Sequence, residues 1–429
     1  MNKSTSFMNP RALSTLMLFI CLSLVLCCGD GQTRKESDNK YKEQVKALIS
    51  RPELVKAFEY VDNSRDEILR EWITITEINA PSGKERERAA YIEKLLRQLG
   101  LQEIHYDSAG NLIAVRKGTG SGPVVVIDAH LDTVFQEGLK ISTTIHDGKI
   151  YAPGVGDNAR NIEAILATIR ALDHANIKTE SDLVFVFTVE EETDLRGANA
   201  FVKDNKEKIN YYIALDAGYE GFTYGGIGIK WYKHHLIGPG GHTRFRTPPQ
   251  SATLPLARAI RRIYELPLSK SPPTHLNIGM LSGASAVNTK AADAWFTVDL
   301  RSTSNEMIVD LEKKIAEIIL EEAGRENMTV KTEVILTMPA VQIPGHRESP
   351  LVKTAEAVHT QMGFKGHITV TGSNDSIAAL LAGIPAISTG TAPCGNSHTL
   401  NEWCEIEPFF KGIKKVLLLE VALAQLASN

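Results

Sequence analysis

The sequence predicts an α/β fold, with a mostly parallel sheet covered by helices on both faces and a smaller α+β block inserted into it. Short apolar runs alternate with helical stretches over the first half of the chain. That rhythm changes after about residue 227 and returns near residue 349. Strand–helix alternation is typical of parallel sheets, because each crossover lays a helix on one face of the sheet.

The predicted elements of the sheet domain follow in order. Apolar residues at helical spacing predict a helix over 43–70, interrupted at Pro52, and another over 86–99, which Gly100 ends. Strands and helices then alternate, at 124–127, 162–172, 183–187, 198–202 and 211–215. The inserted block reads strand, helix 254–264, two strands, helix 305–323 and strand. The alternation resumes at 349–362, 368–370 and 386–388 and closes with a helix over 409–426. We therefore expect a main domain of residues 41–226 and 335–429 and an inserted domain of residues 227–334.

Composition excludes several classes of protein. The 429 residues are 43% hydrophobic and 23% charged, which excludes wholesale disorder and collagen. The formal net charge is −4, without the basic excess of a general nucleic-acid binder, so no nucleic-acid partner is expected. Of five cysteines, only Cys394 and Cys404 lie in the body of the chain. They could form one disulfide but no cysteine-rich zinc site, so any metal must be held by His, Asp and Glu.

The N-terminus predicts export. Lys3 and Arg11 precede an apolar run from Leu13 to Leu26 that is shorter than a comfortable membrane span, which favours a secretory signal over residues 1–28. The alternative is a membrane-anchoring helix. Cys27 and Cys28 resemble the cleavage box of a bacterial lipoprotein, although the expected small residue before the cysteine is missing. We expect a periplasmic or cell-surface protein, with a lipid on one of these cysteines and residues 29–40 as a tether.

Acidic and imidazole side chains follow the predicted strands. His130 and Asp132 lie two residues apart at a strand end, so they project from the same face. Asp157 follows a glycine turn before a helix, where it could be no more than a helix cap. Three carboxylates at 190–192 follow another strand and would repel one another unless a cation or a shared proton relieved them. The last two candidates are Asp216, directly after a strand, and His398, on a late glycine-containing loop.

Each of these residues alone could be an ordinary solvated polar group. Together they favour one site, because sites in open α/β sheets form at the carboxyl ends of the strands. Two imidazoles and three carboxylates without thiolates suit two divalent ions bridged by one carboxylate.

The order of the motifs resembles the co-catalytic zinc exopeptidase and aminoacylase family of peptidase T, carboxypeptidase G and acetylornithine deacetylase. The resemblance covers about residues 75–425. It rests on six ordered motifs: His-x-Asp, Gly-Asp-Asn, Glu-Glu before Arg-Gly-Ala, strand-Asp, Gly-Pro-Gly-Gly-His and the late histidine. It implies a zinc-exopeptidase-like main domain and an inserted lid that is also the dimerisation domain, so we expect a homodimer.

The resemblance also implies the role of each site residue. One zinc ion would be held by His130, Asp157 and Asp216, and the second by Asp157, Glu192 and His398. Glu191 corresponds to the general base and Asp132 supports His130. The peptide bond between Asp157 and Asn158 is implied to be cis. His242 corresponds to a lid histidine that reaches the substrate carbonyl, often across the dimer, and Asn288 and Arg301 correspond to lid contacts with the substrate's carboxylate end.

These roles predict a two-metal exopeptidase that hydrolyses short peptides. An N-acyl-amino-acid deacylase with the same machinery is the first alternative, and a metal-free binding protein on the same fold is the second. The sequence departs from the family at Asn161, where a glycine is common, and at Asp194, which adds negative charge near the metals. Cys394 lies near His398, but no His–Cys motif supports a nucleophile, so we expect it to be structural or incidental.

Overall fold

The computed structural model describes residues 39–101, 103–120, 122–216, 218–245 and 250–427. The predicted signal segment and residues 29–38 of the tether lie outside this part of the chain. Residues 39 and 40, expected to end the tether, instead begin a helix over 39–49. None of the helices in the described ranges is both long enough and apolar enough to cross a membrane.

An eight-stranded sheet forms the larger lobe, called the sheet lobe, in the order β1-β2-β6-β3-β7-β17-β8-β16. Its strands are β1 (Glu103–Tyr106), β2 (Leu112–Arg116), β3 (Val125–His130), β6 (Leu183–Thr188), β7 (Tyr211–Ala214), β8 (Phe222–Thr223), β16 (Ile368–Thr369) and β17 (Ala386–Ser388). The central strands β6, β3, β7 and β17 run parallel, whereas β1, β2 and β8 bring antiparallel pairings toward the edges. The predicted α/β sheet is therefore confirmed.

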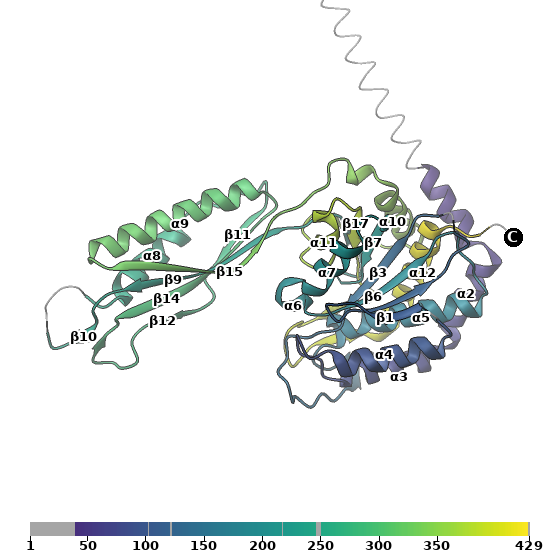
Figure 1. Ribbon diagram of the computed structural model, residues 1–429, viewed down its shortest axis with the longest axis horizontal. Coiled ribbons are helices and arrows are strands. Elements are labelled where there is room, and N and C mark those ends of the chain that lie inside the picture. Colours follow the sequence, from purple (N-terminus) through teal and green to yellow (C-terminus); the bar gives the residue numbers. More distant parts are fainter. Residues whose placement is uncertain (1–38, 102, 121, 217, 246–249, 428–429) are drawn as a thin grey trace, which may run out of the picture.

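Helices cover both faces of this sheet (Figure 1). Alternate residues of β3 divide between two apolar clusters, because successive strand side chains point to opposite faces. Val125 and Ile127 join the larger cluster, whereas Val126 joins the smaller one. The larger cluster contains residues of α2 (Pro52–Asn63), α3 (Arg65–Glu77), α4 (Arg86–Gln98), α5 (Arg160–His174), α10 (Pro350–Gln361) and α12 (Ile406–Ala424). The smaller contains residues of α7 (Arg196–Asn205) and α11 (Ser376–Leu381).

The second lobe, called the lid lobe, comprises the elements between Gly228 and Met338 and projects from the sheet lobe (Figure 1). Its main sheet follows the order β11-β14-β9-β15, with β12 also paired to β14. The strands are β9 (Gly228–Ile237), β11 (Thr274–Asn277), β12 (Leu281–Ser282), β14 (Asp293–Ser302) and β15 (Thr329–Met338). The helices α8 (Thr253–Tyr264) and α9 (Asn305–Arg325) pack on one face, over their own apolar cluster. At the far end, β10 (Gly241–His242) pairs with β13 (Thr289–Lys290).

Several elements differ from the sequence-based expectation. The long N-terminal helix is broken at Ser64, whose dihedrals (φ −102°, ψ 15°) leave the helical region, as well as before Pro52. The strand β15 runs to Met338, past residue 334. The hairpin β1–β2 was not predicted, nor was a small sheet of β4 (Thr144–His146), β5 (Lys149–Tyr151), β18 (Cys394–Gly395) and β19 (Trp403–Glu405). The strands of this small sheet are two or three residues long, too short for apolar alternation to reveal them.

Candidate metal centre

The five predicted ligands come together at the carboxyl edge of the central sheet. His130 ends β3, and Asp216 lies just beyond the end of β7. Glu192 lies in the short helix α6 (Glu191–Asp194), which follows β6. His398 lies between β18 and β19, and Asp157 lies in the turn before α5. The parallel strands deliver three of the five to one edge because their carboxyl ends coincide.

Asp157 lies at the middle of the cluster. Its Oδ1 is 2.9 Å from His130 Nε2, and its Oδ2 is 3.0 Å from His398 Nε2. Asp216 Oδ2 lies 4.0 Å from His130 Nε2, and Glu192 Oε1 lies 3.1 Å from His398 Nε2. The peptide bond from Asp157 to Asn158 is cis, as the resemblance implied.

The donor set fits two divalent ions. One group of ligand atoms belongs to His130, Asp157 and Asp216, and a second to Asp157, Glu192 and His398; within each, the atoms lie within 4.8 Å of one another. A third group, of His130, Glu191 and Glu192, meets the same limit and brings Glu191 next to both of the others. Ligand atoms around one tetrahedral zinc ion are about 3.3 Å apart, since each bond is about 2.0 Å long. The spacings of 2.9, 3.0 and 3.1 Å are close to that value, whereas the 4.0 Å between Asp216 and His130 is wider. Asp157 is common to the first two groups.

Asp132 orders the groups around the ligands. Its side chain is fully buried and accepts the N–H groups of Glu191 and Glu192, at 3.0 and 3.2 Å, and the hydroxyl of Ser82 at 2.6 Å. His130 Nδ1 lies 3.1 Å from the carbonyl oxygen of Asp132 and 3.4 Å from its Oδ1. A proton on Nδ1 satisfies this contact and leaves Nε2 as the ligand atom. The supporting role predicted for Asp132 thus has a geometric basis.

Glu191 lies next to the cluster and is buried, with 9% of its surface exposed. Burial raises the pKa of its carboxyl well above the usual value, an effect that His130 opposes and that Asp216 and Asp375 reinforce. Burial and the nearby Asp157 likewise raise the pKa of Asp216 to about 7. Hydrogen bonds to Asp157 and Glu192 raise the pKa of His398 to about 10. Carboxylates crowded in this way are stabilised by added positive charge, as bound cations would supply.

Sequence reasoning missed several residues that hold the ligands in place. The carboxylate of Glu402 is buried and accepts three backbone N–H groups from the turn that carries Asp157. The side-chain amide of Asn374 donates to the carbonyl oxygen of Asp216 at 2.5 Å. The only signal for Glu402 was its position four residues after His398 in the printed sequence.

The structure shows the surroundings of Asn161 and Asp194, the two residues at which the sequence departs from the family pattern. Asn161 donates to Asn158 Oδ1 at 2.5 Å and accepts the hydroxyl of Thr391 at 2.6 Å, so it ties the ligand turn to the loop after β17. Asp194 is exposed at the end of α6. Cys394 forms a disulfide with Cys404, which confirms a structural rather than nucleophilic cysteine.

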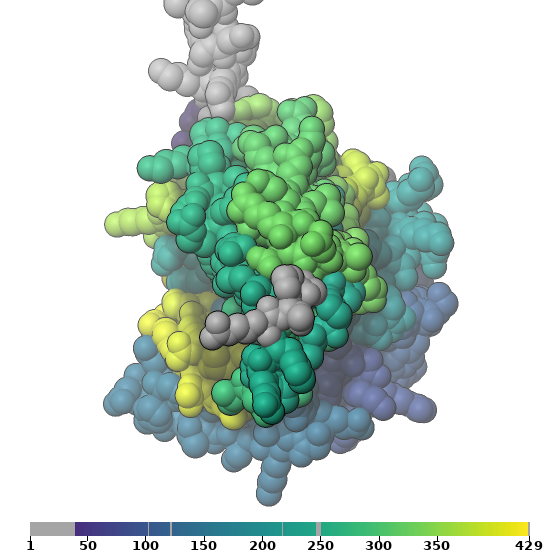
Figure 2. Space-filling model, turned by 90° about the vertical axis from the view of Figure 1, so that its left-hand side faces the viewer, coloured from purple at the N-terminus to yellow at the C-terminus, as the bar shows by residue number. Residues whose placement is uncertain are grey.

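The predicted substrate residues of the lid do not reach the cluster. His242 and Asn288 are exposed at the β10–β13 end of the lid lobe, where Thr243 N donates to Asn288 O at 3.1 Å. That end is the part of the lid lobe farthest from the sheet lobe, as Figure 1 shows. Figure 2, which views the molecule from this end, shows the lid lobe in front of the sheet lobe. Arg301 lies near the carboxyl end of β14, where it forms an ion pair with Asp299.

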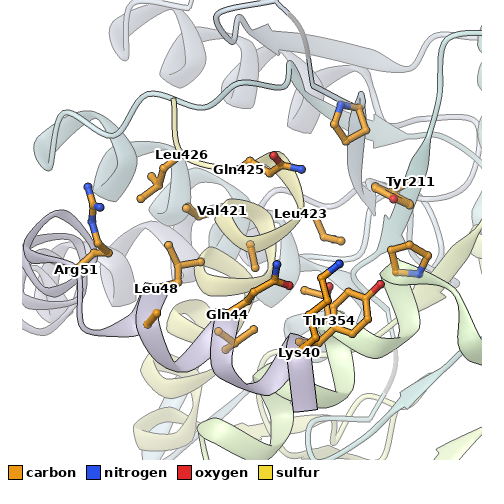
Figure 3. A pocket seen from close by; sticks show the side chains of 16 residues that line it. Lys40, Gln44, Leu48, Arg51, Tyr211, Thr354, Val421, Leu423, Gln425 and Leu426 are labelled. Atoms are coloured by element: carbon orange, nitrogen blue, oxygen red, sulfur yellow. The ribbon is translucent and has the colours of Figure 1, made fainter. Parts of the chain in front are cut away.

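Cavities lie at both ends of the central strands. One of 690 Å³ adjoins the metal cluster and is lined by Asp157, Asp216 and Arg160 among others. Another, of 630 Å³, lies between helix 39–49 and α12 and is lined by Pro123 and Tyr211, at the amino ends of β3 and β7 (Figure 3). Only the first adjoins the predicted ligands, so it is the cavity that can receive a reacting group.

Comparison with known proteins agrees with this geometry. Residues 126–419 match the family described as Peptidase family M20/M25/M40. The chain belongs to this family. It is therefore a metal-dependent hydrolase, as the resemblance implied. Carboxypeptidase G2 of Pseudomonas sp. (strain RS-16) is 24% identical over 326 residues, which cover 72% of this chain and 77% of that protein.

Solved structures share the whole architecture. A tripeptidase from Staphylococcus aureus superposes with a TM-score of 0.74 at 23% identity, covering 84% of this chain and 99% of the other. A Bacillus subtilis protein, described as a dinuclear metal binding peptidase of the M20 family, gives a TM-score of 0.64 at 16% identity, covering 85% and 99%. Both solved structures therefore share the fold of this chain over most of its length.

Proposed function

We propose that this protein is a two-metal exopeptidase that hydrolyses the amide bonds of short peptides. The observation that carries the proposal is the pair of three-residue donor groups that share Asp157, with the buried carboxyl of Glu191 beside them. The names of the tripeptidase and carboxypeptidase relatives support the substrate class.

The donors favour zinc at both positions. His130, Asp157 and Asp216 would hold one ion and Asp157, Glu192 and His398 the other, with imidazole and carboxylate donors that suit zinc. Such ions, when bound, polarise a carbonyl group and make water a stronger acid. Glu191 would take the proton of the attacking water, because its buried carboxyl lies directly beside His130 and Glu192, one ligand of each proposed ion.

His242 is suited to donate a hydrogen bond to the substrate. Its Nδ1 accepts the backbone N–H of Arg244 at 3.0 Å, so in the neutral ring the proton lies on Nε2. This N–H could stabilise a negatively charged oxygen on the substrate. Asn288 lies beside it, and we propose that both act on the metal centre of a second copy, within a homodimer formed through the lid lobe. Arg301 would bind the substrate carboxylate as a bidentate donor.

We also propose that the chain is exported, and held at the membrane by a lipid on Cys27 or Cys28. The disulfide between Cys394 and Cys404 supports export, since stable disulfides are typical of oxidising compartments. Mass spectrometry of the mature N-terminus after expression in a bacterial host tests this. An unprocessed N-terminus would contradict it.

A hydrolysis panel tests the reaction. Dipeptides and tripeptides should be cleaved, with activity lost on chelation and restored by zinc, whereas N-acyl amino acids should react more slowly. The acetylornithine deacetylase of Shigella sonnei, 24% identical over 320 residues, makes the deacylase the alternative to measure. Preference for N-acyl amino acids would establish that alternative, and bound metal without any hydrolysis would contradict both.

A further inference from the structure

We propose that Glu402 is a positioning residue for the metal centre, and that residues 394–405, called the clamp hairpin, hold the turn that carries Asp157. The inference rests on the proposed two-metal function, because it concerns how the shared ligand is kept in place.

The carboxylate of Glu402 makes three hydrogen bonds to one turn. Its Oε1 accepts the N–H groups of Gly156 and Asp157, at 2.7 and 2.8 Å, and its Oε2 accepts the N–H of Gly154 at 3.0 Å. The residue is fully buried, so without this carboxylate the three donors would lose their partner away from water. In addition, the carbonyl oxygen of Glu402 accepts the N–H of Ala152 at 3.1 Å.

The same hairpin holds Asp157 from two directions. His398, between the two strands of the hairpin, lies 3.0 Å from the carboxylate of Asp157, while Glu402 binds its backbone N–H at 2.8 Å. Both the side chain and the main chain of the shared ligand are thereby fixed relative to one short segment.

Covalent and steric constraints hold the hairpin against the turn. The disulfide between Cys394 and Cys404 joins its two strands. A side chain at Gly156 would meet Cys404 Sγ at 2.8 Å and Glu402 Oε1 at 2.9 Å, so the turn lies directly against both. Closing the hairpin reduces the arrangements that Glu402 and His398 can adopt before metal binds, which favours binding.

The location of Glu402 is otherwise unfavourable. A buried carboxylate close to Asp157 adds negative charge where ligand carboxylates already repel one another. The three N–H bonds account for its presence there, because they orient the turn while they offset that repulsion.

The test is Glu402→Gln, compared with Glu420→Gln. Glu420 is also a fully buried glutamate, but it lies on α12 and bonds Thr168, away from the ligands. Zinc affinity measured by competition with a chelator should fall about 10- to 100-fold in Glu402→Gln, the range for residues that orient metal ligands. It should stay at the wild-type value in Glu420→Gln. Wild-type zinc affinity in a folded Glu402→Gln protein would overturn the proposal.

Two further measurements separate positioning from a general loss of stability. Backbone amide exchange over residues 152–160 of the metal-free protein should speed up in Glu402→Gln, while exchange in β3 and β6 stays unchanged; uniform acceleration would count against positioning. Excess zinc should restore activity to Glu402→Gln but not to Glu191→Gln. If Glu402→Gln does not fold, Glu402→Asp, which keeps the charge but shortens the reach, replaces it with the same expectation.

A double variant tests the hairpin itself. Cys394→Ala with Cys404→Ala should also weaken zinc binding, and unchanged affinity would remove the disulfide from the proposal.

These zinc affinities do not depend on which bond the enzyme cleaves. A chain that binds zinc as expected here but hydrolyses nothing would contradict the proposed function and leave this inference standing.

Discussion

The sheet lobe and the lid lobe carry their predicted functional residues in opposite ways. In the sheet lobe, His130, Asp132 and Glu191 are buried and held by neighbouring groups. In the lid lobe, His242 and Asn288 are exposed, on two-residue strands or next to them. The first set is already arranged around the proposed metal positions, whereas the second lies apart from the metal donor groups found among the described residues.

The difference in burial between the two lobes corresponds to two tasks, holding metal ions and contacting the substrate. Metal ligands need fixed positions, which buried hydrogen-bonded side chains provide at the end of a sheet. Substrate contacts must admit and release a molecule, so they can come from a surface that closes or from a second copy. Variants of the metal ligands or of Glu191 in the sheet lobe should therefore change metal content or proton transfer, while variants of His242 or Asn288 in the lid lobe should change catalysis alone.

The largest effect is expected from Asp157→Ala. Asp157 belongs to both donor groups, so its removal should lower metal content at both positions together and abolish hydrolysis. Metal analysis of the purified protein checks this, with Asp147→Ala as control, since the side chain of Asp147 is 90% exposed on a surface turn. Loss of a single ion would show that Asp157 is not shared.

Glu191→Gln should leave both ions bound but lower kcat about 10²- to 10⁴-fold, the usual contribution of a general acid or base. The control is Glu190→Gln, because Glu190 forms an ion pair with Arg196 at 2.7 Å and is not among the groups assigned to proton transfer. Near-normal kcat in metal-loaded Glu191→Gln would remove it from the mechanism.

His242→Ala should lower kcat/KM about 100-fold, the lower range for one oxyanion donor, with metal content and Tm unchanged because the residue is exposed. His275→Ala, an exposed histidine of β11 in the same lobe, is the control. In heterodimers with Glu191→Gln, one site would have both intact groups, so part of the activity should return. Efficient subunit exchange without such rescue would place His242 in its own chain's site or outside catalysis.

The smallest effect on activity is expected from Glu420→Gln, which instead changes how stability depends on pH. Burial raises the pKa of Glu420 to about 8. Between its ordinary value of 4.5 and about 8, the unfolded chain loses this proton and the folded chain keeps it. The wild-type free energy of unfolding therefore falls as pH rises through that range, and the variant lacks this loss. Denaturant titrations at several pH values should show the variant gaining stability relative to wild type toward pH 8, and a constant difference would contradict this.

Much of the metal centre was predictable because it depends on chain direction. Residues that directly follow β3, β6 and β7 lie at one edge of a parallel sheet, whatever the details of packing. The His130–Asp132 pair, the acidic residues after β6 and Asp216 therefore located the site together, although each alone could have been an ordinary solvated group. The supporting groups were not predictable in this way, since Ser82 and Asn374 lie far in sequence from the residues that they bind.

The sequence by itself determined the α/β class and the inserted lobe and placed His130 and Asp216 at strand ends, because periodicity and strand direction are local properties of the chain. The assignment of Asp157, Glu192 and His398 as the other ligands came from the resemblance to the family. Only the tertiary structure decided that Cys394 pairs with Cys404, that Glu402 binds the turn of Asp157, and that His242 lies at the far end of the lid lobe. Glu402 and Asp157 lie far apart in sequence, and even the sequence separation of 10 between Cys394 and Cys404 carries no local pattern that sets their pairing. These contacts depend on how the loops fold over the end of the sheet, which no local pattern of residues specifies.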